Sequence, residues 1–132
     1  MEDFINNNDD GIDPLIKVCL IYYQFESIHP FYDGNGRIGR ILNILYLVLN
    51  NLIDSPILYL SKYINKTKQE YYKLFNEVRE NNNFEDWILY ILKWIEITSK
   101  ETIELIKNIQ NEMMKYKKEF KEKLPKIYSK EL

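Results

Sequence analysis

The residues best suited to chemistry in this 132-residue chain are gathered in one stretch, HPFYDGNGRIGR, at positions 29–40. The chain has one histidine and four glycines, and the stretch contains that histidine, His29, and three of the glycines. It also contains two of the three arginines. Such a concentration of rare residue types indicates a built site rather than an ordinary surface loop.

The glycines and arginines of this stretch predict a phosphate-binding site. Gly34 and Gly36 allow backbone conformations in which successive N–H groups point inward as an anion-binding concavity. A helix predicted from about Gly36 adds the unpaired N–H groups and partial positive charge of its N-terminus. Arg37 and Arg40 lie near that positive end at a cost of a few tenths of a kcal/mol each, which a bound polyphosphate would offset. The planar guanidinium fork suits phosphate oxygens.

Two further members of the stretch could act on a bound phosphate. Asp33 is placed to hold a divalent cation that bridges phosphate oxygens, since hard cations prefer carboxylate ligands. His29 has a reference pKa near 6.5, so it can accept a proton around neutral pH. A base, a metal ligand and an anion-binding loop together predict attack on a phosphate group.

Ordinary interpretations compete with this one. A lone histidine is often structural, and glycine-rich turns are often only turns. Gly34, Gly36 and Gly39 also satisfy the dinucleotide pattern G-x-G-x-x-G, but that motif needs a preceding strand and an acidic residue about twenty positions on, where this chain has Tyr59. The P-loop pattern lacks its terminal Lys-Ser/Thr. Both motifs are therefore set aside.

Helices are predicted on both sides of the stretch. Asp13 followed by Pro14 is typical of a helix start, and the segment after it is apolar on nearly every side, as in the middle of a bundle. The helix from about Gly36 has apolar residues at helical spacing, with two arginines and an asparagine on its other face. The apolar residues are Ile38, Ile41, Leu42, Leu45 and Leu49; the polar ones are Arg37, Arg40 and Asn43.

The rest of the chain is also predicted to be helical, so the fold class is all-α. Residues 57–64 indicate a short helix or turn, and Thr67 with Glu70 predicts a capping box that starts the next helix. From Phe84 the chain is compatible with one helix as far as Pro125. Its first half carries core residues, whereas its second half can pack only one narrow stripe. The predicted core residues are Trp87, Ile88, Ile91, Leu92 and Ile95.

Composition excludes several classes of protein. A net charge of −2 and a pI near 5.5 give no general attraction for nucleic acid. The single cysteine, Cys19, lies in an apolar run and predicts a free core thiol in a reducing compartment. The N-terminal residues do not resemble a secretory signal, and the longest apolar run is too short to span a bilayer. We expect a cytoplasmic protein that binds neither membrane nor nucleic acid.

At every fixed position the stretch resembles the signature of the Fic family, H-P-F-x-[D/E]-G-N-G-R-x-x-R. Flanking segments are also similar to the core of bacterial Fic proteins: DPLIK, ILNILYLV, SPILYLSKYI, YYKLF, VRE and WILYIL. The resemblance implies an all-helical bundle that transfers AMP from ATP to a hydroxyl side chain (Tyr, Thr or Ser) of a target protein and releases pyrophosphate. It implies a Fic core over residues 1–123, with ATP as substrate and Mg²⁺ as cofactor. The oligomeric state is left open by the sequence, and a homodimer is one of the states considered.

The resemblance also implies roles for individual residues. His29 would deprotonate the target hydroxyl, and Phe31 would anchor the loop in the core. Tyr71 and Tyr72 match, more loosely, paired tyrosines near the adenosine, although core packing is their ordinary interpretation. The other implied binding residues are Asp33 on Mg²⁺, Gly34, Asn35 and Gly36 in the anion hole, and Arg37 and Arg40 on the outer phosphates.

This sequence departs from the family pattern in two ways. The β-hairpin flap expected upstream is missing, since twelve residues precede Asp13, and no Ser or Thr has Glu four positions on, as the family's inhibitory motif requires. Residues 124–132 look like the lead-in to a winged-helix domain. We therefore expect a fragment of a longer protein. Two alternatives stay open: a nucleotide-binding module without transferase activity, and transfer of UMP, phosphate or phosphocholine.

Overall fold

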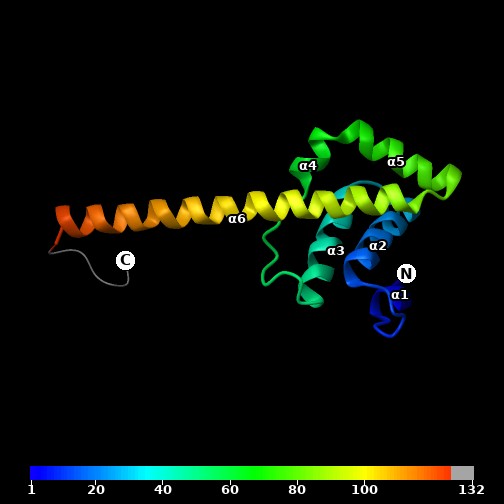
Figure 1. The fold of residues 1–132 in the computed structure, drawn as a ribbon, viewed down its shortest axis with the longest axis horizontal. Coiled ribbons are helices and arrows are strands. Elements are labelled where there is room, and N and C mark those ends of the chain that lie inside the picture. Colours follow the sequence, from blue (N-terminus) through cyan, green and yellow to red (C-terminus); the bar gives the residue numbers. More distant parts are fainter. Residues whose placement is uncertain (126–132) are drawn as a thin grey trace. The chain divides into compact units, whose positions relative to one another are not determined.

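A computed structural model describes residues 1–125 of the chain. Over these residues the structure is helical and contains no strand, so the predicted all-α fold is confirmed. The helices shown in Figure 1 are α1 (Glu2–Asn6), α2 (Pro14–Ile28), α3 (Asn35–Leu49), α4 (Ser61–Lys66), α5 (Lys68–Asn81) and α6 (Phe84–Lys123). Most of the predicted lead-in at 124–132 lies outside the described residues.

Helix α2 is the central helix of the bundle. The Asp13 side chain accepts a hydrogen bond of 2.8 Å from the backbone N–H of Leu15, and Pro14 occupies the first turn, as the sequence predicted. More than one face of the helix is buried. The buried apolar residues are Val18, Cys19, Ile21, Tyr22 and Phe25. The prediction of a free, buried thiol at Cys19 is confirmed.

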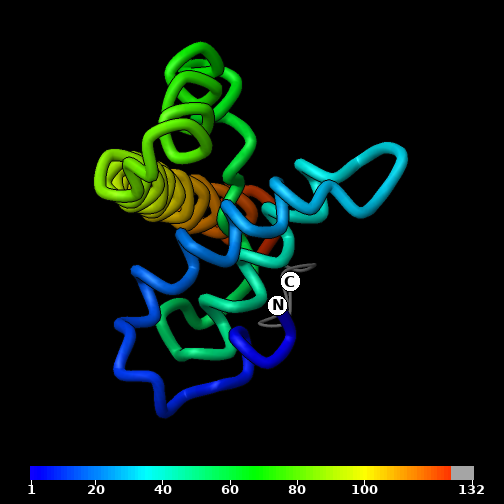
Figure 2. Tube along the Cα trace, turned by 90° about the vertical axis from the view of Figure 1, so that its right-hand side faces the viewer, coloured from blue at the N-terminus to red at the C-terminus, as the bar shows by residue number. Residues whose placement is uncertain are grey.

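The first half of α6 lies between the α2–α3 pair and the α4–α5 pair, as Figures 1 and 2 both show. Two indole N–H groups connect α6 to these neighbours. Trp87 donates to the carbonyl of Cys19 at 3.1 Å, and Trp94 donates to the carbonyl of Leu60 at 2.7 Å. The predicted core residues of α6 are buried or packed against the core. A cluster of aromatic rings fills this region: Tyr22, Tyr23, Tyr71, Phe75, Trp87, Tyr90 and Trp94.

Helix α3 has the predicted extent but turns a different face to the core. The apolar stripe of Ile38, Ile41, Leu45 and Leu49 is exposed. The buried residues are instead small or polar ones spaced four positions apart, namely Asn35, Gly39 and Asn43. Tyr46 and Leu47 are buried nearer the end of the helix. The reason is close approach: α3 packs on α2 through Gly39, where a side chain would collide with α2. That contact fixes which face of the helix is buried.

The predicted capping box at Thr67 does not form. Thr67 does precede α5, but it also ends α4, and its hydroxyl donates to the carbonyl of Tyr63 at 2.9 Å. The same hydroxyl lies 2.7 Å from the hydroxyl of Tyr90 on α6. Because these partners occupy the Thr67 side chain, it makes no capping bond to the first turn of α5.

A buried lysine ties the N-terminal segment to the bundle. Lys17 on α2 is 2% exposed, and its ammonium group donates to the carbonyl of Asn7 and to the carboxylate of Asp10. It also lies 4.8 Å from the ring centroid of Phe4 in α1, a short helix that the sequence analysis did not predict. A carboxylate and a carbonyl therefore neutralise and satisfy this buried charge.

The chain divides into two compact units, Met1–Ser99 and a second that begins at Lys100. The first unit contains α1 to α5 and the first part of α6. The described part of the second is the remainder of α6 and the two residues after it, nearly all exposed. No helix within residues 1–125 is both long and apolar enough to cross a membrane.

Candidate functional site

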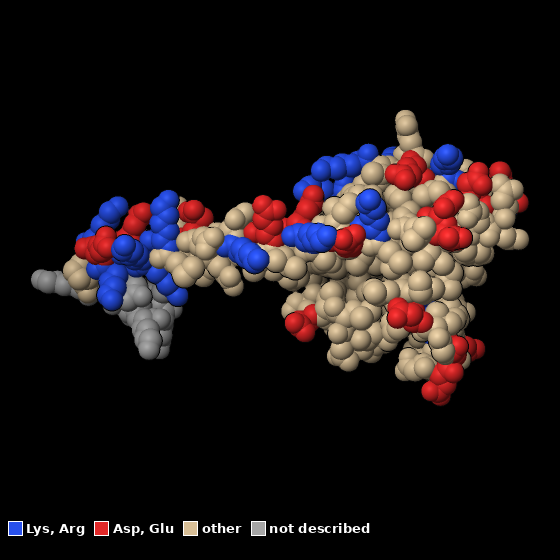
Figure 3. Space-filling model, viewed as in Figure 1, with Lys and Arg blue, Asp and Glu red and all other residues tan. Residues whose placement is uncertain are grey.

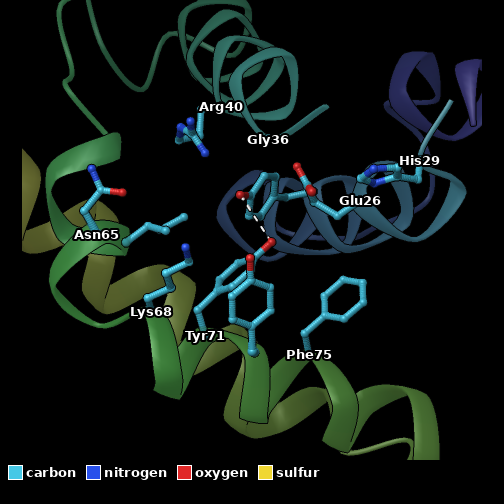
Figure 4. Close-up of a pocket in the computed structure, with 11 residues that line it drawn as sticks. Glu26, His29, Gly36, Arg40, Asn65, Lys68, Tyr71 and Phe75 are labelled. Carbon is cyan, nitrogen blue, oxygen red and sulfur yellow. Dashed lines mark hydrogen bonds between the residues drawn. The ribbon is translucent and has the colours of Figure 1, made fainter. Parts of the chain in front are cut away.

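A cavity of about 350 Å³ opens between α2, α3 and the α4–α5 segment (Figure 4). Charged, aromatic and glycine residues from these elements line it together. Helix α2 contributes Tyr22, Glu26 and, at its end, His29; α3 contributes Gly36 and Arg40; and the α4–α5 segment contributes Asn65, Lys68, Tyr71, Tyr72 and Phe75. Of the predicted residues, the cavity wall thus includes His29, Gly36, Arg40, Tyr71 and Tyr72.

His29 lies where α2 ends. Its backbone adopts a left-handed conformation with φ 49° and ψ 57°, and its N–H donates to the carbonyl of Phe25 at 3.1 Å. This conformation stops the helix and turns the chain into the loop, which Figure 2 shows extending away from α6. The imidazole is exposed and lies beside Glu26 (Figure 4). A base in this position can meet a hydroxyl that approaches from solvent.

The Asn35 side chain closes the loop. Its Oδ1 accepts from the N–H of Phe31 at 2.9 Å, and its Nδ2 donates to the carbonyl of the same residue at 2.7 Å. Asn35 is 2% exposed, whereas Phe31 is 49% exposed, with its ring 6.4 Å from that of Phe25. The prediction that Phe31 anchors the loop in the core is therefore wrong. A buried amide that satisfies both backbone groups of one residue fixes the loop instead.

The N-terminus of α3 faces the loop with its own N–H groups. Gly34 precedes the helix with φ 80°, and no side chain of the described residues caps it. The first-turn N–H groups of Asn35, Gly36 and Arg37 have no carbonyl partner within the helix, so they remain suited to an anion. Gly34, Asn35 and Arg37 do not line the cavity wall itself but lie next to it in sequence.

The two arginines of the stretch differ in their surroundings. Arg37 is 3.9 Å from the carboxylate of Asp33, and both side chains are largely exposed, so this ion pair contributes little to stability. Arg40 is half-buried on the cavity wall. Its Nη1 lies 3.1 Å from where a side-chain carbon at position 36 would be, so the guanidinium group lies over Gly36. A side chain at position 36 would require this flexible guanidinium group to shift slightly.

Asp33 fits a magnesium ion only together with a bound phosphate. Its Oδ1 accepts from the N–H of Gly34 at 2.7 Å, and the rest of the carboxylate is exposed outside the cavity wall. Within residues 1–125 no group of three or more His, Cys, Asp or Glu side chains could hold a metal. Mg²⁺ is usually bound by one or two carboxylates with phosphate oxygens and water, and one exposed carboxylate beside an anion-binding helix end meets that requirement.

Glu26, which the sequence did not single out, lies on α2 beside His29 and Arg40 (Figure 4). Its Oε1 is buried and has no hydrogen-bond partner among the described residues. Burial raises the pKa of Glu26, while the charges of Arg40 and His29 act to lower it. The available signal was the only acidic residue of α2, three positions before the histidine.

The paired tyrosines differ in exposure. Tyr71 is 8% exposed and its hydroxyl donates to that of Tyr22 at 3.5 Å; burial raises the pKa of Tyr71 well above its usual range. Tyr72 is 54% exposed, and its ring lies 5.3 Å from that of Tyr71 in an edge-on arrangement. The Lys68 ammonium group lies 6.0 Å from the Tyr72 ring centroid. Tyr71 is thus mainly a core residue, while Tyr72 has a ring available for a ligand.

Comparison with known proteins identifies the first third of the chain. Residues 1–47 match the Fic/DOC family. A probable protein adenylyltransferase of Aquifex aeolicus is 42% identical over 62 residues, which are 47% of this chain and 19% of that protein. Protein adenylyltransferase fic-1 of Caenorhabditis briggsae is 29% identical over 75 residues, and protein adenylyltransferase Fic of Drosophila willistoni is 40% identical over 42 residues. These cover 54% and 31% of this chain and 13% and 8% of those proteins, respectively.

Residues 1–125 form an all-helical structure with a glycine-rich loop at the N-terminus of α3, bordered by a histidine and two arginines. The family match includes this same loop, so the chain is similar to the Fic/DOC family over residues 1–47, where the site residues up to Arg40 lie. It spans less than a fifth of the length of these three relatives.

Proposed function

We propose that this chain is the core of a protein adenylyltransferase, which transfers AMP from ATP to a hydroxyl side chain of a target protein. The observation that carries the proposal is that His29 and Arg40 line one cavity at the N-terminus of α3. The names of the similar proteins support it, since they are protein adenylyltransferases.

Phosphate binding would use the start of α3. The N–H groups of its first turn would bind phosphate oxygens, and Arg37 and Arg40 would bind the outer phosphates. Because Arg40 is half-buried, its interaction with a phosphate is less screened by water than that of the exposed Arg37. Arg40 should therefore contribute more to nucleotide affinity. Asp33 would hold Mg²⁺, which when bound neutralises phosphate charge.

His29 would act as the general base. Its imidazole would accept the proton of the target hydroxyl while that oxygen forms a bond to the α-phosphorus of ATP. The bond from the α-phosphorus to the bridging oxygen then breaks, and pyrophosphate leaves with the electron pair. The exposed position of His29 is compatible with a hydroxyl carried by a separate protein.

The adenosine is expected to lie on the α5 side of the cavity. Tyr72 offers an exposed ring there, and Tyr71 supports that ring from the core. A nucleobase stacked on an aromatic side chain typically gains about 1–3 kcal/mol. Tyr72 would thus contribute affinity, while Tyr71 would fix its position.

A transfer assay tests the role of His29. We expect the chain with labelled ATP, Mg²⁺ and cell lysate to label a target protein, and His29→Asn to reduce the rate at least ~100-fold, as is typical when a general base is removed. Asparagine tolerates the left-handed backbone at this position, so the loop should be retained. ATP binding should stay within a few-fold of wild type. Transfer at an unchanged rate in the variant would disprove the assignment.

A binding assay tests the role of Arg40 and separates transfer from binding alone. At one hundred times its dissociation constant, ATP with Mg²⁺ should stabilise the chain by about 2.7 kcal/mol, measured as a thermal shift. Arg40→Ala should lose most of that shift. Arg79→Ala, which removes an exposed arginine of α5 outside the cavity, is the matched control and should retain it. A shift without labelling in the transfer assay would favour a nucleotide-binding module.

A further inference from the structure

The outer part of α6, from Lys100 to Lys123, carries an apolar stripe that no other described element covers. Its members are all more than a third exposed, and the core cluster of the described residues ends at Ile95. We call this set the outer stripe; it consists of Ile106, Ile109, Met113, Tyr116 and Phe120. Figure 3 shows charged side chains along one face of α6, with uncharged side chains between them.

The spacing of the outer stripe is that of a coiled coil. Successive members are three, four, three and four residues apart, which places Ile106, Met113 and Phe120 at position a of a heptad and Ile109 and Tyr116 at position d. The positions that face away from such a seam are nearly all polar: Lys107, Asn108, Asn111, Met114, Lys115 and Lys118. On a helix without a partner this repeat would give no stabilisation, because its apolar side chains would bury no surface.

Charges beside the outer stripe indicate the partner and its direction. In this register Glu112 occupies position g and Lys117 occupies position e. In a parallel pair, position g of one helix lies next to position e of the following heptad in the other, so Glu112 would meet Lys117 of the partner subunit. An antiparallel pair would instead bring g positions together, and Glu112 and Glu119 both occupy position g.

We propose that the outer part of α6 forms a parallel, two-stranded coiled coil with a second copy of this chain. The outer stripe is its core, and the reciprocal pairs between Glu112 and Lys117 of the partner subunit set its direction. Because the core has only five apolar layers, the association is concentration-dependent. The proposal is independent of the transferase assignment, since it uses none of the residues of the cavity.

Sedimentation equilibrium of the full chain tests the association, from about 1 to about 200 µM, a range that detects weak dimers. We expect the mass to rise toward that of a dimer. Ile109→Lys places a charge in the seam and should leave a monomer throughout the range. Met114→Lys is the matched control: it lies on the same helix, is 62% exposed and faces away from the seam, so it should dimerise like wild type. Circular dichroism should show that both variants keep their helical content.

Charge exchange tests the predicted pairs. Glu112→Lys should weaken the dimer about 3- to 10-fold, because two attractive pairs become repulsive. Adding Lys117→Glu should restore wild-type affinity. Failure of the double variant to recover would contradict the parallel register.

Cross-linking tests the direction separately. Lys123→Cys introduces a thiol at the next d position. In a parallel pair the d positions of the two helices lie next to each other. Mild oxidation should then give a covalent dimer. The native thiol should not compete, because Cys19 is buried and its pKa is raised to about 12. A chain that stays monomeric throughout the range, or a dimer that does not cross-link, would overturn the proposal. If the chain stays monomeric, the outer stripe would instead be a binding surface for a different polypeptide.

Discussion

Glu26 is the residue of the site whose charge is least well accommodated. It faces Arg40 and His29 across the cavity wall, yet its buried Oε1 has no hydrogen-bond partner among the described residues, and burial raises its pKa. A carboxylate here also adds negative charge where phosphate is proposed to bind. The positive charge of Arg40 acts in the opposite direction and lowers this pKa, but burial is the larger effect.

Replacing Glu26 tests this balance. An acid whose pKa is raised in the folded state contributes fully to folding stability only below its pKa in the unfolded state. This contribution is lost as the pH rises through the folded-state pKa. Glutamine stays neutral, so Glu26→Gln should be more stable than wild type at pH 7. The difference should shrink toward pH 4, where wild type is protonated too. Urea unfolding at both pH values measures it; a variant less stable than wild type at pH 7 would contradict the proposed burial cost.

Contact between α2 and α3 depends on one glycine. A side-chain carbon at position 39 would lie 2.6 Å from Oε1 of Glu26, 2.9 Å from Cε2 of Tyr22 and 3.2 Å from Cδ1 of Phe25. Two of these neighbours are core rings that cannot move without disturbing the bundle. The interface between the two helices is therefore built on the absence of a side chain.

Two alanine variants on the same helix test this interface. Gly39→Ala should lower the free energy of unfolding by about 1–3 kcal/mol, because overpacking outweighs the gain in helix propensity. Gly36→Ala is the control for propensity: its nearest neighbour is the flexible end of Arg40, at 3.1 Å, so stability should be unchanged or slightly higher. Thermal unfolding of both variants gives the comparison. Equal melting temperatures would show that position 39 has room.

Much of the fold could be predicted from local patterns, because caps and apolar periodicity act within one helix. The start of α2 at Asp13 and the length of α6 are examples. The buried face of α3 could not be predicted this way, because Gly39 decides it through contact with another helix. At the site, the signature residues were identifiable from type and spacing. The anchoring role of Asn35 and the position of Glu26 depend on the folded loop, and were missed.

For the whole molecule, the buried thiol and phenols predict sensitivity to alkali. Burial raises the pKa values of Cys19, Tyr22 and Tyr90 to about 12. In the unfolded chain these groups lose their protons near their ordinary pKa values. The unfolded chain therefore binds fewer protons than the folded chain above about pH 9. The stability from keeping these groups neutral is thus complete below about pH 8 and is lost as the pH rises toward 12.

Urea unfolding at a series of pH values checks this expectation. The free energy of unfolding should be nearly constant from pH 7 to 8.5 and then fall by a few kcal/mol toward pH 12. Cys19→Ala removes the group with the lowest ordinary pKa of the three, so its decline should begin about one pH unit later than in wild type. Constant stability from pH 8 to 11 would contradict the assignment of these groups as buried.

The left-handed backbone at His29 also limits how this site can change in evolution. Among the residues that one nucleotide change can produce from histidine, asparagine and aspartate tolerate a positive φ, whereas leucine fits it poorly and proline cannot adopt it. Lineages that lose the base at this position, yet keep the loop folded, should therefore favour Asn or Asp over the other single-nucleotide replacements. The left-handed backbone at position 29 would then persist after selection for the imidazole had ended.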